Sequence, residues 1–447
     1  MTAMNKLGLR NGIKKSDELW ARALKVIATG TQTFSRSPGV FPDGAAPKYL
    51  IKEKGSHVWD VDGNEFIDMV MACGPVTLGH NCEPINEAIK KQMNNGILFS
   101  LLNPLEVEVA EKLTARIPCA EMVKFSKNGS DVCAAAVRLA RAVTGREMIF
   151  CYGYHGFQDW YIGSTDRNAG VPKCVCSLTK PFEYNNIDGL RQMFEKYRGQ
   201  VAAVIMEPVI AEKPKDDFLN KVKLLAHEHG ALLIFDEIIT GFRFRVGGAQ
   251  EFFNVTPDLA TFSKGLTNGM PLGVIAGKRE YMKNFDKAFL SSTYAPETLT
   301  LAAASAVLDF YKENDVIGKL WEKGEYLEKG FKAVIDKHKV SKNVSLAGYP
   351  VRLMVNTHDD KGIQHYNLAT LYQQEMFKEG ILCFAGVLML SYAHSREDLD
   401  CLISAFDKAC GVIKHAVDSG EDIVKFLRCK PGSPVFKGLR ERNAVSN

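Results

Sequence analysis

The sequence predicts an α/β protein whose large domain is built on a mostly parallel central sheet and is accompanied by a smaller α+β domain. The first observation is the order strand, helix, strand. Apolar runs at residues 201–206 and 231–235 flank a helical stretch at 218–228, which Gly230 is expected to end. The second is that both runs are continuously apolar, which is typical of strands buried on both faces of a parallel sheet.

The chain is expected to divide into four segments. They are an N-terminal segment that joins the small domain (1–75), the large domain (76–310), a C-terminal small domain (311–424) and a basic tail (425–447). Asp62-Gly63, between two strand-like runs, predicts a hairpin in the first segment, and the third opens with the longest predicted helix, 315–338. The tail has six basic residues against one acidic residue, a net charge of +5. We expect it to be solvated or draped over a partner, with an arm for an anionic ligand as the alternative.

Composition excludes several classes of protein. The 447 residues are 46% hydrophobic and 24% charged, which is typical of a globular enzyme and not of a fibrous or disordered chain. A net charge of only +4 argues against a nucleic-acid binder, and no apolar run is long enough to span a membrane. No secretory signal is recognised. The 11 cysteines are odd in number and scattered, so we expect reduced thiols in a cytoplasmic protein and no metal site.

Four local features could together form a binding site, and each has an ordinary structural explanation of its own. The first is Gly129-Ser130, which precedes an alanine-rich helical stretch at 132–142, with Ser130 expected as the N-cap. The free N–H groups at such a helix start bind anions, and Gly129 would let them approach a ligand closely. A plain capped helix is the alternative.

The second and third features lie at expected strand ends. Tyr154, in Tyr154-His155-Gly156 after an apolar run, could stack on a planar ring or could be an ordinary core tyrosine. Asp236 ends the run at 231–235, and a buried carboxylate is costly unless a cation or a donor pairs with it. A protonated ring nitrogen would be one such partner, whereas capping of the next loop is the alternative.

The fourth feature is Lys264, in Phe262-Ser263-Lys264-Gly265, which is not on an obvious charged face. Desolvation lowers the pKa of a lysine and makes its amine nucleophilic, as a Schiff-base lysine requires, although a surface lysine is the alternative. Taken together, the four features specify pyridoxal 5'-phosphate (PLP). They supply an anion cradle, a ring stacker, a carboxylate for the pyridine nitrogen and an amine for the aldehyde.

With these motifs the chain resembles the class III (ω-type) PLP-dependent aminotransferases of fold type I, and within them the glutamate-1-semialdehyde aminomutase branch. The resemblance runs from about residue 25 to residue 410. The runs that carry it are, from most to least specific, 232–243, 257–273 and 74–80. Their agreement in the same order makes a chance match untenable.

The resemblance implies a role for each matching residue. Lys264 would bond to the aldehyde of the cofactor, Asp236 would pair with the pyridine nitrogen, and Tyr154 would stack on the ring. The other matches are His155 beside Tyr154, Gly129 and Ser130 at the phosphate, Glu207 at a strand end beside the cofactor, Thr293 at the phosphate of the neighbouring subunit, and Arg36 at the substrate carboxylate. A threonine that serves the neighbour implies a homodimer with shared active sites. For Arg36, pairing with an acidic side chain of the protein is the alternative.

The chain also departs from the branch. Lys127-Asn128-Gly129-Ser130 stands where a Ser/Thr-Gly-Thr run is usual, and Glu297-Thr298 replaces an Asn-Pro pair after Thr293. The glutamate that aminomutases place before an Ala-Gly pair is missing before Ala385-Gly386, and the spacing to Ala393-His394 is longer. These differences favour a changed substrate with retained cofactor chemistry.

The prediction is therefore a PLP-dependent aminotransferase. It would move an amino group between a small-molecule donor, such as glutamate or another amino acid, and an aldehyde or ketone acceptor, for which a sugar or polysaccharide precursor is one candidate. The alternatives are a 2,1-aminomutase of the glutamate-1-semialdehyde type, a PLP-dependent lyase on the same fold, and a binding protein that has kept the fold without the reaction.

Overall fold

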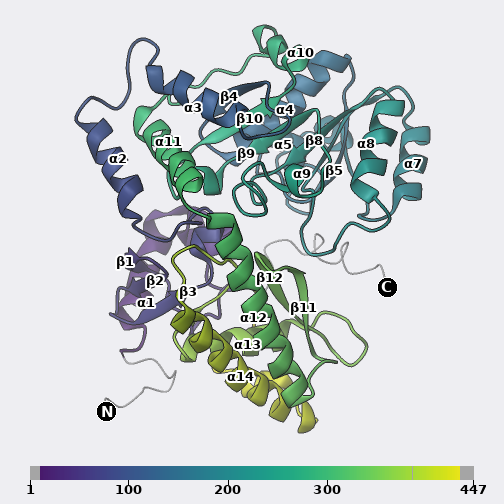
Figure 1. The fold of residues 1–447 in the computed structure, drawn as a ribbon. Helices are drawn as coiled ribbons and strands as arrows, with labels where there is room; N and C mark the ends of the chain where they lie inside the picture. The colour runs from purple at the N-terminus through teal and green to yellow at the C-terminus, as the bar shows by residue number, and fades with distance from the viewer. Residues whose placement is uncertain (1–10, 385, 433–447) are drawn as a thin grey trace. The chain divides into compact units, whose positions relative to one another are not determined.

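The computed structural model describes residues 11–384 and 386–432. Two compact units are present, coloured along the chain in Figure 1. The large unit comprises Glu83–Ile317, and the small unit comprises the described residues up to Cys82 and from Gly318 onward. None of the helices in this described part of the chain combines the length and the apolarity that a membrane crossing requires.

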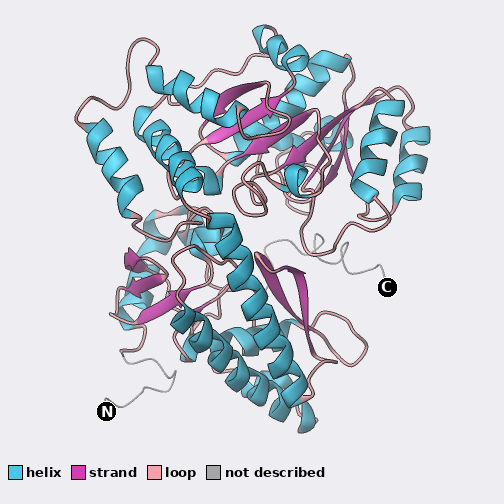
Figure 2. Ribbon diagram, in the orientation of Figure 1, coloured by secondary structure: helices cyan, strands magenta, loops and turns pink. Residues whose placement is uncertain are grey.

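The large unit is built on a seven-stranded sheet (Figure 2). In order across the sheet the strands are β4 (Met122–Ser126), β10 (Gly273–Gly277), β9 (Leu259–Phe262), β8 (Leu232–Asp236), β7 (Val201–Met206), β5 (Met148–Tyr152) and β6 (Thr179–Pro181). From β9 to β6 every neighbouring pair is parallel, whereas β10 is antiparallel to both of its neighbours. The predicted fold class, with its mostly parallel sheet, is therefore confirmed.

Helices connect these strands. The helices of the large unit are α2 (Glu83–Met93), α3 (Pro104–Thr114), α4 (Gly129–Thr144), α5 (Asp159–Ile162), α6 (Lys173–Ser177), α7 (Ile187–Lys196), α8 (Phe218–Glu228), α9 (Ala249–Phe252), α10 (Arg279–Met282) and α11 (Thr298–Glu313), with 3-10 turns η4 (Lys264–Leu266) and η5 (Lys283–Asp286). The strand-helix-strand order read from the sequence is β7, α8 and β8, and its two strands pair in parallel. Gly230 follows α8 with a φ of +66°, a conformation that glycine adopts without strain.

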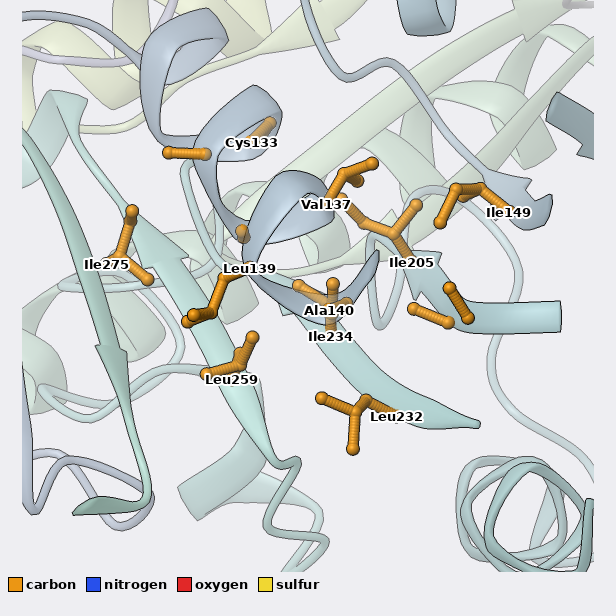
Figure 3. Packing of buried hydrophobic residues seen from close by; sticks show 14 of the residues in the cluster. Cys133, Val137, Leu139, Ala140, Ile149, Ile205, Leu232, Ile234, Leu259 and Ile275 are labelled. Carbon is orange, nitrogen blue, oxygen red and sulfur yellow. The ribbon is translucent and has the colours of Figure 1, made fainter. Parts of the chain in front are cut away.

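The core of the large unit lies between α4 and the sheet. Figure 3 shows Val137, Leu139 and Ala140 of α4 facing side chains of the strands. The strand residues of this core include Ile149, Ile205, Ile234, Leu259 and Ile275, all fully buried. Burying an aliphatic side chain of this size stabilises the folded state by about 1.5–3 kcal/mol relative to leaving it exposed to water. This packing fixes α4, and with it the start of the helix, against the strands.

The small unit contains two sheets. The first has the strand order β1 (Leu50–Lys54), β2 (His57–Asp60), β3 (Glu65–Asp68) and β13 (Ile381–Leu382), and the second β11 (Val344–Tyr349), β12 (Arg352–Thr357) and β14 (Val387–Leu388). Strands β2 and β3 form the predicted antiparallel hairpin around Asp62-Gly63. The helical elements are α1 (Lys14–Val26), α12 (Val316–His338), α13 (Tyr366–Lys378), α14 (Arg396–Asp418), and the 3-10 turns η1 (Ala28–Gly30), η2 (Phe34–Arg36), η3 (Met71–Cys73) and η6 (Ile423–Phe426). Helix α12 corresponds to the helix that was predicted as the longest, and α14 has the same length of 23 residues.

The backbone of the first part of the basic tail is hydrogen-bonded to the small unit, although the side chain of Lys430 is 82% exposed. The backbone N–H of Arg428 donates to Gln374 Oε1 (2.5 Å) and that of Gly432 to Thr370 Oγ1 (2.9 Å). Lys430 Nζ lies 3.4 Å from Asp43 Oδ2. Backbone bonding to buried polar side chains holds this part, which charge counting does not anticipate. Residues 433–447 and Ala385 lie outside the described residues.

Candidate active site

Four neighbouring strands of the large unit, β5, β7, β8 and β9, end at the same edge of the sheet because they pair in parallel. Tyr154 and His155 follow β5, Glu207 follows β7, Asp236 is the last residue of β8, and Lys264 follows β9. Ligands of parallel sheets bind beyond the carboxyl ends of the strands. Five residues predicted from separate motifs therefore share one edge of the sheet.

Asp236 is the most heavily supported of these residues. Its Oδ2 atom lies 2.8 Å from His155 Nδ1 and accepts a hydrogen bond from Cys133 Sγ (3.4 Å). Its Oδ1 atom accepts from the backbone N–H of Ile238 (3.1 Å) and from Thr261 Oγ1 (3.4 Å). The side chain is 2% exposed, so these donors replace the water that the carboxylate has lost. A carboxylate held in this way is suited to bind a protonated nitrogen.

His155 connects Asp236 to an aromatic wall. Its ring lies 6.1 Å from the ring of Trp160 at 20°, and edge-on to Tyr161 at 5.2 Å. Its Nε2 atom is buried and has no hydrogen-bond partner among the described residues. A buried polar atom without a partner costs about 1–3 kcal/mol, so this nitrogen is available to a group that the chain does not supply.

Glu207 orients the turn that carries Tyr154. Its Oε1 atom accepts a hydrogen bond from the backbone N–H of Tyr154 (3.0 Å), and the residue is 7% exposed. A Cβ atom at Gly153 would lie 2.8 Å from this same oxygen, so only glycine fits beneath the carboxylate. The ring of Tyr154 stands edge-on to Tyr161 at 5.7 Å, and the residue is 48% exposed. The turn thus presents an aromatic ring that its own chain covers only in part.

Helix α4 begins two residues earlier than the sequence suggested. The N-cap is Asn128, whose side-chain oxygen accepts from the N–H of Asp131 (3.0 Å), so the expectation that Ser130 is the N-cap was wrong. Asparagine is as good an N-cap as serine, so the residue type alone could not decide between Ser130 and the asparagine two residues earlier. Gly129 and Ser130 are consequently the first residues inside the helix. Their N–H groups have no intrahelical acceptor and carry the positive end of the helix dipole.

Two close approaches bring this helix start to the other site residues. A Cβ atom at Gly156, where φ is +102°, would lie 2.2 Å from Ser130 Oγ, so the loop after β5 rests directly on the start of α4. A Cβ atom at Gly129 would lie 2.6 Å from Ile238 Cδ1, on the loop after Asp236. Gly156 is therefore required by packing, and the start of α4 adjoins the loops that carry Tyr154, His155 and Asp236.

Lys264 has a strained backbone. Its φ of +42° lies in the left-handed region, which residues with a side chain rarely adopt. Such a residue costs on the order of 1 kcal/mol or more and persists only where its surroundings enforce it. Nearby, Ser263 Oγ donates to the carbonyl oxygen of Leu272 (2.6 Å) and holds the turn from the preceding residue. Strain of this kind is concentrated at functional sites.

Two further predicted site residues come from other parts of the chain. Thr293 belongs to the exposed stretch 291–294 of the large unit. Arg36 belongs to the small unit, where it ends η2.

The sequence analysis missed Cys133 and Thr261. Cys133 lies one helical turn after Gly129-Ser130, a spacing that places residues on the same face of a helix. Thr261 is the direct neighbour of Asp236 across β8 and β9. The helical spacing could have indicated the cysteine, whereas the strand register could not be read from the chain.

Cys133, His155 and Asp236 offer ligand atoms within 4.8 Å of one another, which raises the question of a metal ion. Burial, and then the charge of Asp236, raises the pKa of the Cys133 thiol well above its usual range. Without a metal ion the thiol is therefore protonated and donates to the carboxylate (3.4 Å). This chemistry favours a hydrogen-bonded support for Asp236.

Two comparisons with known proteins define the family. The family model of class III aminotransferases matches residues 42–409. A curated relative, the 3-aminobutyryl-CoA aminotransferase of Cloacimonas acidaminovorans (strain Evry), is 32% identical over 413 residues, which is 90% of this chain and 98% of the relative. The chain belongs to the class III aminotransferases. It is a PLP-dependent transferase of fold type I, as predicted.

Solved structures agree with this class III fold. The PLP internal aldimine form of the Sphingopyxis sp. MTA144 FumI protein is similar with a TM-score of 0.85 and 25% identity, covering 93% of this chain and 100% of that protein. A glutamate-1-semialdehyde-aminomutase from Pseudomonas aeruginosa PAO1 has a TM-score of 0.78 at 19% identity, covering 89% and 94%. At that identity the comparison shows the fold alone, so it gives no further support to membership of the aminomutase-like branch.

The residues of the site fit the cofactor of the class III enzymes. A helix start with free N–H groups suits a phosphate, and the half-exposed Tyr154 ring suits the face of a pyridine. Asp236 suits its nitrogen, and Lys264 stands in a strained turn at the same edge of the sheet. The unpartnered Nε2 atom of His155 leaves one further polar position for a ligand.

Proposed function

We propose that this aminotransferase moves an amino group between an amino acid, with glutamate as the first candidate, and a ketone whose carbonyl is at carbon 3 of an acyl compound. The observation that carries the proposal is the 32% identity, over nearly the whole of both chains, to an enzyme named for 3-aminobutyryl-CoA. A sugar or polysaccharide precursor is the second candidate acceptor. The sequence around Phe34-Ser35-Arg36 and Ser292-Thr293-Tyr294 resembles a subgroup of these enzymes from sugar and surface-polysaccharide pathways.

Each site residue has a proposed task. Bound PLP supplies an electron sink that stabilises negative charge on the substrate carbon that loses its proton. Asp236 keeps the proton on the pyridine nitrogen, while His155, Cys133 and Thr261 hold its carboxylate in place. The N–H groups at the start of α4 bind the phosphate, and Tyr154 covers one face of the ring.

Lys264 has two proposed tasks, as anchor and as proton carrier. Its amine would hold the cofactor in the resting enzyme, and once displaced it would accept the proton from the amino-bearing carbon of the substrate and return it elsewhere. The turn that forces its backbone into the left-handed region fixes the start of its side chain, so the amine has a limited range of positions.

We also propose that the enzyme is a homodimer with shared sites. Two features support this. Thr293, the match for a threonine that serves the neighbouring subunit, lies in an exposed stretch. A run between α2 and α3 also exposes large apolar side chains: Ile97 (46%), Leu98 (41%), Phe99 (42%), Leu101 (86%) and Leu102 (88%). The N–H of Thr298 donates to the carbonyl oxygen of Ile97 (2.9 Å), so this run adjoins the chain that follows Thr293. Exposed apolar patches of this kind mark interfaces.

The dimer is tested by subunit mixing. Lys264→Ala subunits and Thr293→Ala subunits are each expected to be nearly inactive, whereas a heterodimer of the two holds one site with both residues intact. Each heterodimer should therefore have about half of the activity of a wild-type dimer, and a randomly exchanged equimolar mixture about one quarter. Demonstrated subunit exchange without any recovery would contradict sharing through Thr293.

The substrates are tested by separate half-reactions. The enzyme is mixed with one donor at a time, and conversion of the cofactor to pyridoxamine phosphate is followed by absorbance, with Lys264→Ala as the inactive control. The aminated form is then mixed with 3-oxoacyl thioesters and with keto sugars. Faster turnover of the keto sugars would replace the proposed acceptor with the second candidate. Conversion of glutamate-1-semialdehyde to 5-aminolevulinate, without transfer to a separate acceptor, would instead reveal an aminomutase.

Arg36 is proposed to bind the carboxylate of a substrate through two parallel hydrogen bonds, a geometry that guanidinium groups offer. Arg36→Lys should then raise the KM for a dicarboxylate donor at least tenfold and leave that for an uncharged amine unchanged. An equal effect on both donors would assign the arginine a structural role.

A further inference from the structure

The exposed stretch that carries Thr293 is fastened at both ends to one element, α4 and the turn that leads into it. At its start, Arg138 Nη1 of α4 donates to the carbonyl oxygen of Phe289 (2.7 Å). At its end, Lys127 Nζ lies 3.0 Å from Glu297 Oε2. Residues 291–294 between these points are exposed. We call residues 289–297 the Thr293 loop. Its ends are fixed while its tip is free to meet another molecule.

The attachment at the end of the loop is a built cluster. Glu297 is the N-cap of α11, and its Oε1 atom accepts from the N–H of Leu299 (2.6 Å). Its Oε2 atom accepts from Thr300 Oγ1 (2.5 Å) and from Lys127 Nζ, which also donates to Thr300 Oγ1 (3.2 Å). The side chains of Lys127 and Glu297 are only 17% and 13% exposed. Both charges are therefore shielded from solvent and hydrogen-bonded to each other.

Glu297 is ionised in this cluster at neutral pH. Burial alone would raise its pKa, but the hydrogen bonds from Thr300 and Lys127 and the charge of Lys127 lower it. The attraction therefore acts between two full charges in a poorly hydrated place, where it is stronger than at an exposed surface. These are also positions at which the chain departs from its family pattern, because Lys127 and Glu297 stand where other residues are usual.

Lys127 connects this cluster to the start of α4. Lys127 is the single residue between the end of β4 and Asn128, the N-cap whose helix begins with the anion cradle at Gly129 and Ser130. We propose that the Lys127–Glu297 ion pair positions two parts of the same subunit relative to each other. One part is the start of α4, which binds the phosphate in that subunit's own site, and the other is the Thr293 loop, which completes the site of the partner subunit. The inference rests on the homodimer proposed above.

The test measures cofactor binding in heterodimers in which only one subunit keeps Lys264. Borohydride reduction then traps the cofactor at that subunit alone, and a titration gives its dissociation constant without any measurement of turnover. In the trans heterodimer, the subunit without Lys264 also carries Glu297→Gln, so the reporting site meets a loosened Thr293 loop. In the cis heterodimer, the reporting subunit itself carries Glu297→Gln. The coupling predicts a dissociation constant about fivefold higher in both.

Matched variants separate positioning from general loss of stability. Lys127→Met should repeat the effect of Glu297→Gln, and Lys127→Arg should restore near-normal binding. Lys112→Met is the control, because Lys112 also pairs with α11, at Asp309 Oδ2 (2.8 Å), but lies far from the Thr293 loop in sequence; the two side chains are 23% and 49% exposed. It should lower the melting temperature by less than Lys127→Met and leave the dissociation constant unchanged. An effect confined to the cis heterodimer, or an equal effect of Lys112→Met, would overturn the proposal.

Failure of the dimer proposal is recognised separately. A third heterodimer carries Thr293→Ala in the subunit that lacks Lys264. If this change weakens the reporting site while Glu297→Gln does not, sites are shared but the ion pair does not couple them, and the inference is wrong. If Thr293→Ala is itself without effect, sharing through Thr293 fails, and the inference fails with it.

Discussion

Replacing Asp236 with asparagine separates the charge of this residue from its structural contacts. The asparagine carbonyl can still accept from the N–H of Ile238 and from Thr261 Oγ1, which lie 3.1 Å and 3.4 Å from Oδ1. Its amide can donate to His155 Nδ1 once the imidazole takes the other tautomer, because that contact is 2.8 Å. The contacts with Ile238, Thr261 and His155 are therefore retained, whereas the hydrogen bond from Cys133 Sγ (3.4 Å) is lost together with the negative charge.

The size of the effect follows from burial. Asp236 is 2% exposed, and removing one partner of a buried ion pair costs on the order of 3–5 kcal/mol. If that cost falls on the charge-separated transition state for proton removal, the rate falls by about 10²- to 10⁴-fold. Rapid mixing of the PLP enzyme with protiated and α-deuterated donor measures this step directly, and the isotope effect should rise as the step slows.

A matched variant completes this experiment. Thr261→Val removes the hydroxyl donor 3.4 Å from the same carboxylate and leaves the charge, so its rate should fall by less than tenfold. Asp236→Asn with a rate within tenfold of the wild type, and an unchanged isotope effect, would refute the assigned role. It would mean that the ring nitrogen does not depend on this carboxylate.

Three further predictions concern single side chains. Lys264→Ala should lose the visible absorption of lysine-bonded cofactor, and borohydride labelling of the wild type should modify Lys264; label on another lysine would rule it out. Burial alone would lower the pKa of His80, but Asp68 and a second carboxylate raise it to about 9, above the 6.5 of the unfolded chain. Its stabilising effect, about 3 kcal/mol, is complete below pH 6.5 and is lost as the pH rises through 9. The free energy of unfolding of His80→Gln, measured by urea titration, should therefore decrease less between pH 6.5 and pH 9 than that of the wild type. Burial lowers the pKa of His394 to about 4, so stability should fall by about 3 kcal/mol between pH 6.5 and pH 4. His394→Asn, which keeps an acceptor for the N–H of Ser391 (3.0 Å), should remove most of that acid sensitivity, and an unchanged acid limb would contradict the assignment.

Local sequence patterns were sufficient to predict the central strand-helix-strand unit of the large sheet. The strand at 201–206 and the helix at 218–228 were predicted with the bounds that the structure gives, because a continuous apolar run and a helical period are properties of neighbouring residues. Gly230 marked the helix end for the same reason. Asp236 and Lys264 could be proposed as site residues because strand ends and apolar flanks are also local features.

Contacts between distant segments were not predictable in this way. The support of Asp236 by Cys133 depends on how α4 crosses the sheet, and its support by Thr261 depends on the pairing of β8 with β9. The attachment of Lys127 to Glu297 joins residues 170 positions apart. Even the N-cap of α4 was misassigned, because Asn128 and Ser130 are equally good caps and only the backbone conformation decides between them.

The left-handed backbone of Lys264 has a consequence for how this enzyme can change over time. Glycine would occupy that position without strain, so Lys264→Gly should be more stable than Lys264→Ala by about 1 kcal/mol. The residue proposed to anchor the cofactor is therefore one that selection for stability alone would discard. A lineage that ceased to need the reaction would gain stability by losing this lysine first, so a lysine kept at this position in a relative is a record of continued use.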